Sequence, residues 1–178
     1  LERVSKSGAK FDQDKAKWFN HQYLMQSSDE SILESIQDQL TEQHQSQGDN
    51  YIKKVIGLLK EKVSFANEIM PLADYFFGNP SSYDEKVLRK KWNGEVAAQI
   101  GEYVSLVTSK EATSAEDFES LLQGYADTNQ INKGRLMQPL RWVVSGMAGG
   151  PPIFDMLALI GRESVSERLL IALEKHPV

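Results

Sequence analysis

The 178-residue chain is 40% hydrophobic and 25% charged, which is typical of a globular protein long enough to bury a core. It has no cysteine, so a disulfide framework, a zinc–thiolate cluster and a thiol nucleophile are excluded. The formal net charge of −5 argues against strong nonspecific binding of nucleic acid, although local clusters of Lys and Arg leave room for basic faces.

No apolar run approaches the roughly 18–20 residues that cross a bilayer, so we expect no membrane partner. The absence of cysteine fits a reducing compartment, and we expect a cytoplasmic location. The chain begins with Leu1 and carries three cations and no apolar block in its first ten residues. That start is unlike a signal peptide, and we expect the chain to be part of a longer protein.

Helical periodicity runs through the first half of the chain. We expect helix caps at Asp12, Ser27 and Ser64, and we expect a further helix to start at Asp49 or Asn50. Ser27 is followed three residues later by Glu30, the spacing of a capping box. The strongest break is "FFGNPSSYDE", where Gly, Asn and Pro follow one another, and we place the main boundary of the chain there.

The second half has the same character. We expect helices to be capped by Asp84, by Ser114 with Asp117, and by Ser164 with Glu167. Between them, a helix that contains Pro139 should end at Gly146 in a left-handed conformation, and Pro152 suits the first turn of the next helix, which Gly161 ends. No stretch has convincing strand character, so the predicted fold class is all-α.

The residue types that commonly carry out chemistry do not form a catalytic or metal-binding pattern. His21, His44 and His176 lie far apart and have no His or carboxylate partner three or four residues away. The glycine-rich stretches follow no strand and lack the Gly-Lys-Ser/Thr of a phosphate loop. We therefore predict no catalytic residue, no metal site and no cofactor in this chain.

Two groupings are more suggestive of binding. In "QPLRWVVSGMAGGPPIF" an arginine, Arg141, precedes a glycine–proline loop, which allows close approach of a planar ligand and stacking or bidentate donation by the guanidinium. The alternative is a helix–loop–helix corner, with Trp142 and Phe154 in the core and Arg141 in a surface ion pair. In "RVSKSGAKFDQDKAKWFN" cations alternate with aromatic residues, as in a strip that contacts a nucleic-acid backbone or in a capped amphipathic helix.

Three stretches resemble one family. "LERVSKSGAKFDQDKAKWFNHQYL" is similar to the segment that follows the catalytic domain in bacterial glutamyl-tRNA synthetases, which are class I enzymes. "MQPLRWVVSGMAGGPPIFDMLALIGRESVSERLLIAL" resembles the C-terminal end of that family, and "LLKEKVSFANEIMPLADYFF" looks like its linking helical segment. The stretches occur in the right order and together cover most of the chain.

The resemblance implies a tRNA anticodon-binding region built from two consecutive helical bundles. Its implied parts are 1–28, the end of a stem-contact region, 29–78, a first anticodon-binding subdomain, and 79–178, a second one. The family ligates glutamate to its tRNA with ATP and Mg²⁺, but the chain has no His-x-Gly-His signature and no Rossmann pattern. We therefore expect a non-catalytic, monomeric fragment whose partners are glutamate tRNA isoacceptors and its own N-terminal catalytic domain.

The resemblance assigns the family's binding roles to individual residues of this chain, one motif position at a time. The Arg after Gln-Pro-Leu falls on Arg141, which would contact an anticodon base, with Gln138 one turn earlier to assist. The loop that reads bases partly through main-chain groups falls on Gly150 and Pro151, and the following apolar contact falls on Ile153. Here Gly-Gly-Pro-Pro replaces the more usual Thr/Ser-Pro-Gly, which removes a hydroxyl and one N–H, so readout would depend on the Gly150 amide and on carbonyls.

Three cations complete the set that the resemblance implies. The family arginine that reads the third anticodon base strictly has its nearest equivalent in Lys62, which lacks the bidentate fork. Lys6 and Arg3 are candidates for contact with the tRNA backbone. A rival interpretation makes the chain a helical protein–protein interaction module, because residues 29–49 hold six acids and no Lys or Arg and could dock a basic partner.

Overall fold

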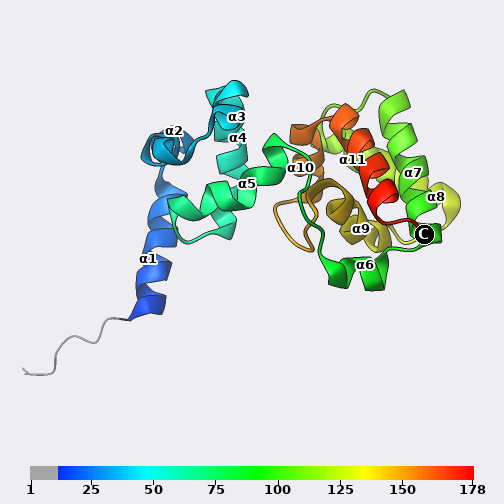
Figure 1. Cartoon of the computed structure of the whole chain (residues 1–178), viewed down its shortest axis with the longest axis horizontal. Coiled ribbons are helices and arrows are strands. Elements are labelled where there is room, and N and C mark those ends of the chain that lie inside the picture. Colours follow the sequence, from blue (N-terminus) through cyan, green and yellow to red (C-terminus); the bar gives the residue numbers. More distant parts are fainter. Residues whose placement is uncertain (1–11) are drawn as a thin grey trace, which may run out of the picture.

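The structure is a computed structural model that describes residues 12–178. Within this range the chain forms eleven α-helices and three short 3₁₀ helices and no strand, which confirms the all-α prediction (Figure 1). None of these helices combines the length and the apolarity that spanning a membrane requires. Lys6 and Arg3 lie outside the described residues.

The helices form two groups on either side of a narrow junction (Figure 1). The first bundle consists of α1 (Gln13–Gln26), α2 (Asp29–Ser35), η1 (Gln37–Gln39), α3 (Glu42–Ser46), α4 (Asp49–Leu59), η2 (Lys60–Lys62), η3 (Ala66–Glu68) and α5 (Ile69–Phe77). Helix α4 is its centre, since α2, α3 and α5 all pack on it. Its apolar stripe of Ile52, Val55, Ile56 and Leu59 is buried as the periodicity indicates.

Two of the three predicted caps in the first bundle are wrong. Helix α2 is capped by Ser28, whose hydroxyl accepts from the Ser31 N–H, and not by its neighbour Ser27. The cap predicted at Ser64 is not formed either, because the Ser64 and Phe65 N–H groups donate to the carboxylate of Glu68. Only the short η3 precedes α5 at this point. The predicted cap at Asp12 and the predicted start of a helix at Asp49, where α4 begins, are confirmed.

The second bundle consists of α6 (Glu85–Lys91), α7 (Gly94–Ser109), α8 (Ala115–Asn129), α9 (Lys133–Ser145), α10 (Ile153–Ile160) and α11 (Arg162–Lys175). Trp142, Tyr103 and Phe118 fill its core. Asp84 caps α6, and Ser114 with Asp117 forms the predicted capping box of α8. The cap predicted at Ser164 is wrong, because α11 begins at Arg162, directly after Gly161 (φ 86°) turns the chain.

Arg168 of α11 connects the two bundles. Its guanidinium donates hydrogen bonds to the carbonyl oxygen of Val144 (2.5 Å), in the last turn of α9, and to that of Gly78 (2.8 Å), just after α5. The residue is only 3% exposed. Carbonyl groups at a helix end carry partial negative charge, so they are suitable partners for a buried cation. The end of α5 is thereby held at a fixed place against α9.

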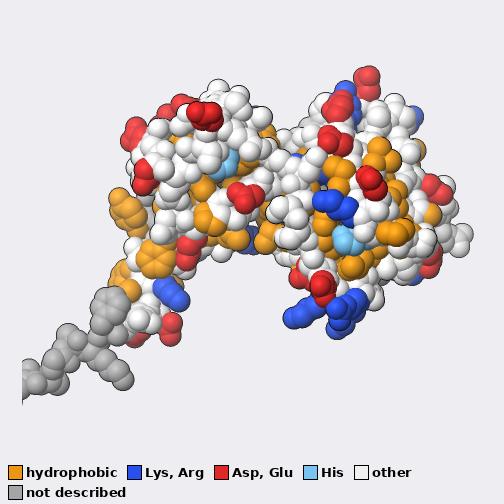
Figure 2. Space-filling model, in the orientation of Figure 1, with side chains coloured by type: hydrophobic (Ala, Val, Ile, Leu, Met, Phe, Trp, Pro, Cys, Tyr) orange, Lys and Arg blue, Asp and Glu red, His pale blue; other side chains and the backbone are white. Residues whose placement is uncertain are grey.

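Helix α1 projects from the first bundle (Figure 1), and apolar side chains gather on its surface (Figure 2). Trp18 (57% exposed), Phe19 (56%) and Tyr23 (73%) face outward, and Leu24 is its one buried residue. Its contacts with the rest of the described chain are mainly with η2, where a ring nitrogen of His21 lies 2.8 Å from the Val63 carbonyl oxygen.

Candidate functional site

The candidate site forms where α9 ends and the 146–152 loop begins. Gly146 adopts a left-handed conformation (φ 73°), as predicted, and its N–H donates to the Trp142 carbonyl at 2.8 Å. Ser145 donates its hydroxyl hydrogen bond to the Arg141 carbonyl (2.8 Å) and accepts the Met147 N–H (3.2 Å). The loop therefore leaves the helix on the face that carries Arg141.

Arg141 is half-buried, and its terminal nitrogen Nη1 is shielded from solvent without a hydrogen-bond partner among residues 12–178. No ion pair within that range includes it, so the surface ion pair of the alternative interpretation is not formed. Burial lowers the pKa of the guanidinium, and the nearby Tyr75 partly opposes this effect. A buried nitrogen that lacks an acceptor is costly, which suits a group that awaits a ligand.

Gly150 and Tyr75 complete the surroundings of this guanidinium. A Cβ atom placed on Gly150, where φ is +154°, would lie 3.0 Å from Arg141 Nη1 and 3.7 Å from the Tyr75 hydroxyl oxygen. Only glycine combines this backbone conformation with such close approach. Sequence reasoning missed Tyr75, because "LADYFF" reads as an apolar helical stripe in which a tyrosine has no special mark.

The other predicted residues are less closely grouped. Gln138 lies half-buried on α9, one turn before Arg141. Pro151 and Ile153 (3% exposed) are buried, so neither side chain offers a surface to a base in this conformation. Lys62 is exposed in η2, which packs against α1 in the first bundle, whereas Arg141 belongs to the second. Trp142 lies in the core, as the helix–loop–helix alternative predicts, whereas Phe154, which that alternative also places in the core, is half-buried.

A groove lined by both polar and apolar side chains runs along the junction beside this site. We call it the junction groove. It measures about 530 Å³, and its lining includes Asp74 and Tyr75 of α5, Thr41, Gln43 and His44 around α3, the Gly78–Ser82 linker, and Ser145 to Met147. A volume of this size is in the range of small-ligand pockets. Tyr75 therefore borders both the groove and the Arg141 guanidinium.

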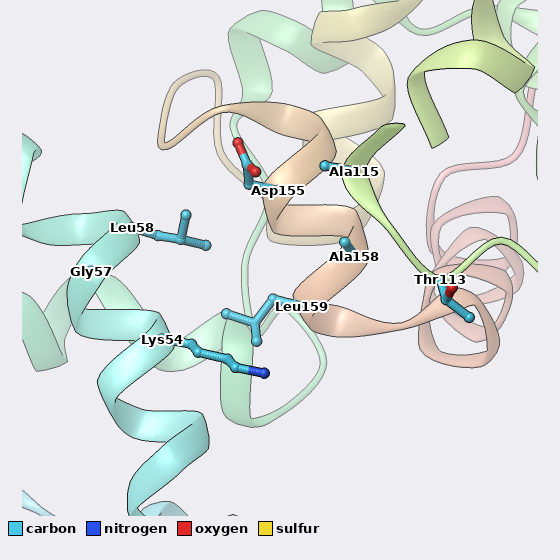
Figure 3. A pocket seen from close by; sticks show the side chains of 8 residues that line it. All are labelled: Lys54, Gly57, Leu58, Thr113, Ala115, Asp155, Ala158 and Leu159. Atoms are coloured by element: carbon cyan, nitrogen blue, oxygen red, sulfur yellow. The ribbon is translucent and has the colours of Figure 1, made fainter. Parts of the chain in front are cut away.

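A second cleft of about 440 Å³ separates α4 from α10 and the start of α8 (Figure 3). Lys54 and Leu58 line it from α4, and Asp155 and Leu159 line it from α10. Its two charged groups are both exposed and have opposite sign, and no ion pair within residues 12–178 joins them. The cleft thus contains no convergent set of polar groups comparable with that around Arg141.

The charges near the site are unevenly distributed. Helix α6, which packs on α9, carries the exposed cations Lys86, Arg89, Lys90 and Lys91, and Lys and Arg side chains gather at that edge in Figure 2. The acidic stretch of the first bundle is partly neutralised, because Lys60 pairs with Asp29 (2.8 Å) and Lys53 pairs with Glu30 (2.9 Å). No cluster of three or more possible metal ligands occurs within residues 12–178.

The comparisons with known proteins agree with one another. The family model of the anticodon binding domain matches residues 17–173. The glutamate–tRNA ligase of Porphyromonas gingivalis is 37% identical over 174 residues, which are 98% of this chain and 34% of that protein. That of Flavobacterium johnsoniae is also 37% identical, over 95% of this chain and 34% of the relative.

Solved structures give the same result. A crystal structure of a glutamate tRNA ligase from Elizabethkingia meningosepticum, in complex with its amino acid, superposes with a TM-score of 0.86 at 34% identity. It covers 96% of this chain, and the chain covers 34% of it. The chain thus spans about a third of the length of the relatives that it matches.

Proposed function

Because the chain belongs to the anticodon binding domain family, we propose that it is the tRNA-reading part of a glutamate–tRNA ligase. The relatives that it matches over nearly its whole length are glutamate–tRNA ligases, and it corresponds to about a third of each. The complete protein would ligate glutamate to its tRNA with ATP and Mg²⁺, and the catalytic residues would lie in its remaining part.

One observation carries the proposal at the level of residues, namely the shielded and unpartnered Nη1 of Arg141 beside a glycine loop. Single-stranded RNA loops present unstacked bases whose edges offer acceptor atoms to such donors. A guanidinium donates two parallel hydrogen bonds in a fixed plane, so it suits a base edge better than an ammonium group does. The cations of the neighbouring α6 would add contacts to phosphates, which position the RNA without reading its sequence.

The other predicted residues have supporting roles in this proposal. Gln138 would assist Arg141, and Gly150 and Pro151 would contribute main-chain groups, while the buried Ile153 would support the loop from beneath. Lys62 would approach the anticodon from the first bundle as a point charge. Lys6 and Arg3, outside the described residues, would contact the tRNA backbone.

The wider organisation is part of the same proposal. Residues 1–28 would end a stem-contact region, and 29–78 and 79–178 would be the two anticodon-binding subdomains. The protein would be a cytoplasmic monomer that binds glutamate tRNA isoacceptors, and its bundles would connect the anticodon to its own N-terminal catalytic domain.

The test is the affinity of the 178-residue chain for an anticodon stem-loop. Arg141→Ala should weaken binding to the stem-loop with the glutamate anticodon by roughly 1–3 kcal/mol. Arg135→Ala is the matched control, since Arg135 lies on the same helix and donates to Glu95 at 2.9 Å on the exposed surface. Dissociation constants measured at two salt concentrations, with a stem-loop of altered anticodon alongside, separate base reading from phosphate attraction.

The rival interpretation as a protein–protein module predicts a different result. In that case neither stem-loop would bind at low salt, and Arg141→Ala would have no effect. Equal affinity of Arg141→Ala and the parent chain for the glutamate stem-loop would remove the role assigned to Arg141.

A further inference from the structure

We propose that Tyr75 is a specificity-determining positioning residue, whose hydroxyl holds the Arg141 guanidinium in place against the base that it reads once that base is bound. This inference rests on the proposed function and adds a group from the other bundle to the site. Arg141 belongs to α9 in the second bundle, and Tyr75 belongs to α5 in the first. The reading site would therefore be complete only when the two bundles are docked.

The geometry brings the two groups to one place. Arg141 Nη1 and the Tyr75 hydroxyl oxygen lie 3.0 and 3.7 Å from the position that a Cβ atom on Gly150 would take. In this structure Nη1 has no hydrogen-bond partner within residues 12–178, so the bond between the two groups would form as a base binds. The ring of Tyr75 is fixed, because the residue is 5% exposed and stacks at a tilt on Phe76 with ring centroids 4.4 Å apart. Within residues 12–178 the other two buried tyrosines are Tyr103 and Tyr125, which donate to the Phe118 carbonyl and to the Glu102 carboxylate, whereas the Tyr75 hydroxyl makes no hydrogen bond in this range.

The chemistry of a hydroxyl suits this position. It holds one donor and two acceptor lone pairs, so it can accept from a guanidinium N–H and still donate to a ligand. Arg141 and Tyr75 would then present two donors side by side. A base edge with two neighbouring acceptor atoms, such as O2 and N3 of cytosine, matches that pair, whereas an edge that places an amino group there would be rejected.

The junction groove reaches Tyr75, which lines it together with Met147 at the start of the loop, and Arg141 lies beyond this lining. A base turned out of an RNA loop could approach from that side without displacing the core. The charge of Arg141 acts on Tyr75, because it opposes the rise in the pKa of the Tyr75 phenol that burial causes. Because burial nevertheless raises the pKa of the phenol overall, the phenol stays protonated and keeps its donor.

The experiment compares Tyr75→Phe with the parent 178-residue chain. The measured quantity is the ratio of dissociation constants for stem-loops with an altered and with the glutamate anticodon. Loss of one neutral hydrogen bond should lower this ratio about 3- to 10-fold. Tyr51→Phe is the matched control, because it deletes a hydroxyl in the same bundle that donates to the Phe76 carbonyl (2.7 Å), and it should leave the ratio unchanged.

A double-mutant cycle separates positioning from an independent contact. If Tyr75 acts through Arg141, Tyr75→Phe should have no further effect in the Arg141→Ala background. A second readout uses the complex with the glutamate stem-loop, in which Tyr75→Phe should speed the rotation of the Arg141 guanidinium observed by nitrogen NMR. An unchanged ratio, an additive cycle or an unchanged rotation overturns the inference.

The two proposals fail in different ways. If the parent chain does not distinguish the two stem-loops, the proposed function fails and this inference fails with it. If the parent discriminates and Arg141→Ala abolishes discrimination while Tyr75→Phe behaves as the parent, only the role of Tyr75 is overturned.

Discussion

At the scale of single residues, Gly146 has two separate tasks. Its φ of 73° ends α9, and a Cβ atom on it would lie 2.0 Å from the Ser82 carbonyl oxygen in the linker. Its own carbonyl accepts the N–H of Asp84 at 2.7 Å. The left-handed end could be predicted from sequence, because Gly follows an apolar helix. The contact with Ser82 could not, because it joins segments more than sixty residues apart.

Replacement of Gly146 should therefore be costly. Gly146→Ala combines a strained backbone with a clash against main-chain atoms, and we expect it to lower the free energy of unfolding by at least about 2 kcal/mol. Gly149→Ala is the control, since nothing lies within 4 Å of a Cβ placed there. Urea unfolding monitored by circular dichroism measures both variants. Equal midpoints for the two would contradict this account.

At the scale of helices, local capping decided which predictions succeeded. The capping box of α8 was predictable, since Ser114 and Asp117 have no competitors nearby. At α2 two adjacent serines compete, and the second one caps. At α11 the turn at Gly161 lets the helix begin before Ser164. Short α3 was missed because its cap, in which the Thr41 N–H donates to His44 Nδ1 at 3.1 Å, has no standard sequence signature.

The α8 capping box predicts a dependence of stability on pH. The Asp117 carboxylate accepts N–H bonds from Ser114 (2.9 Å) and Thr113 (3.0 Å), which lower its pKa from 3.8 to about 2. A lowered folded-state pKa means that the contribution is present above about pH 4 and is lost as pH falls toward 2. Asp117→Asn should therefore flatten the fall in stability across this window.

Thermal unfolding of both chains at several pH values between 4 and 2 checks this expectation. Glu116→Gln is the control, because it removes a carboxylate from the same first turn without touching the capping box. If Asp117→Asn kept the full acid sensitivity of the parent, the two N–H bonds would not be its source.

At the scale of the whole molecule, long-range contacts place the functional groups. Periodicity and caps were sufficient to predict an all-α chain, and resemblance indicated Arg141 and Gly150, whose roles remain predictions. Neither the sequence pattern nor the resemblance could indicate Tyr75, because its hydroxyl comes near the Arg141 guanidinium only when α5 packs against α9. The docking of the bundles also depends on Arg168, a residue that no local pattern marks.

Removal of the Arg168 bridge should loosen that docking. Arg168→Met leaves the buried carbonyl of Val144 and the partly buried carbonyl of Gly78 without their donors, and we expect a loss of about 2–4 kcal/mol in the free energy of unfolding. Arg162→Met on the same helix is the control, since Arg162 pairs only with the exposed neighbouring Glu163 within the described range. Urea unfolding with tryptophan fluorescence, which reports on Trp92 and Trp142 of the second bundle, measures both. Equal losses in the two variants would contradict the assigned role.

The sparse attachment of α1 has a consequence for amide hydrogen exchange. Only Leu24 of this helix is buried, so its turns can open without disturbing α4 or α7. Amides of α1 should then exchange at rates set by local fraying, whereas those around Tyr103, with its ring fully buried in α7, should exchange only when the whole bundle opens. Added denaturant would accelerate exchange in the α7 core and leave the rates in α1 almost unchanged.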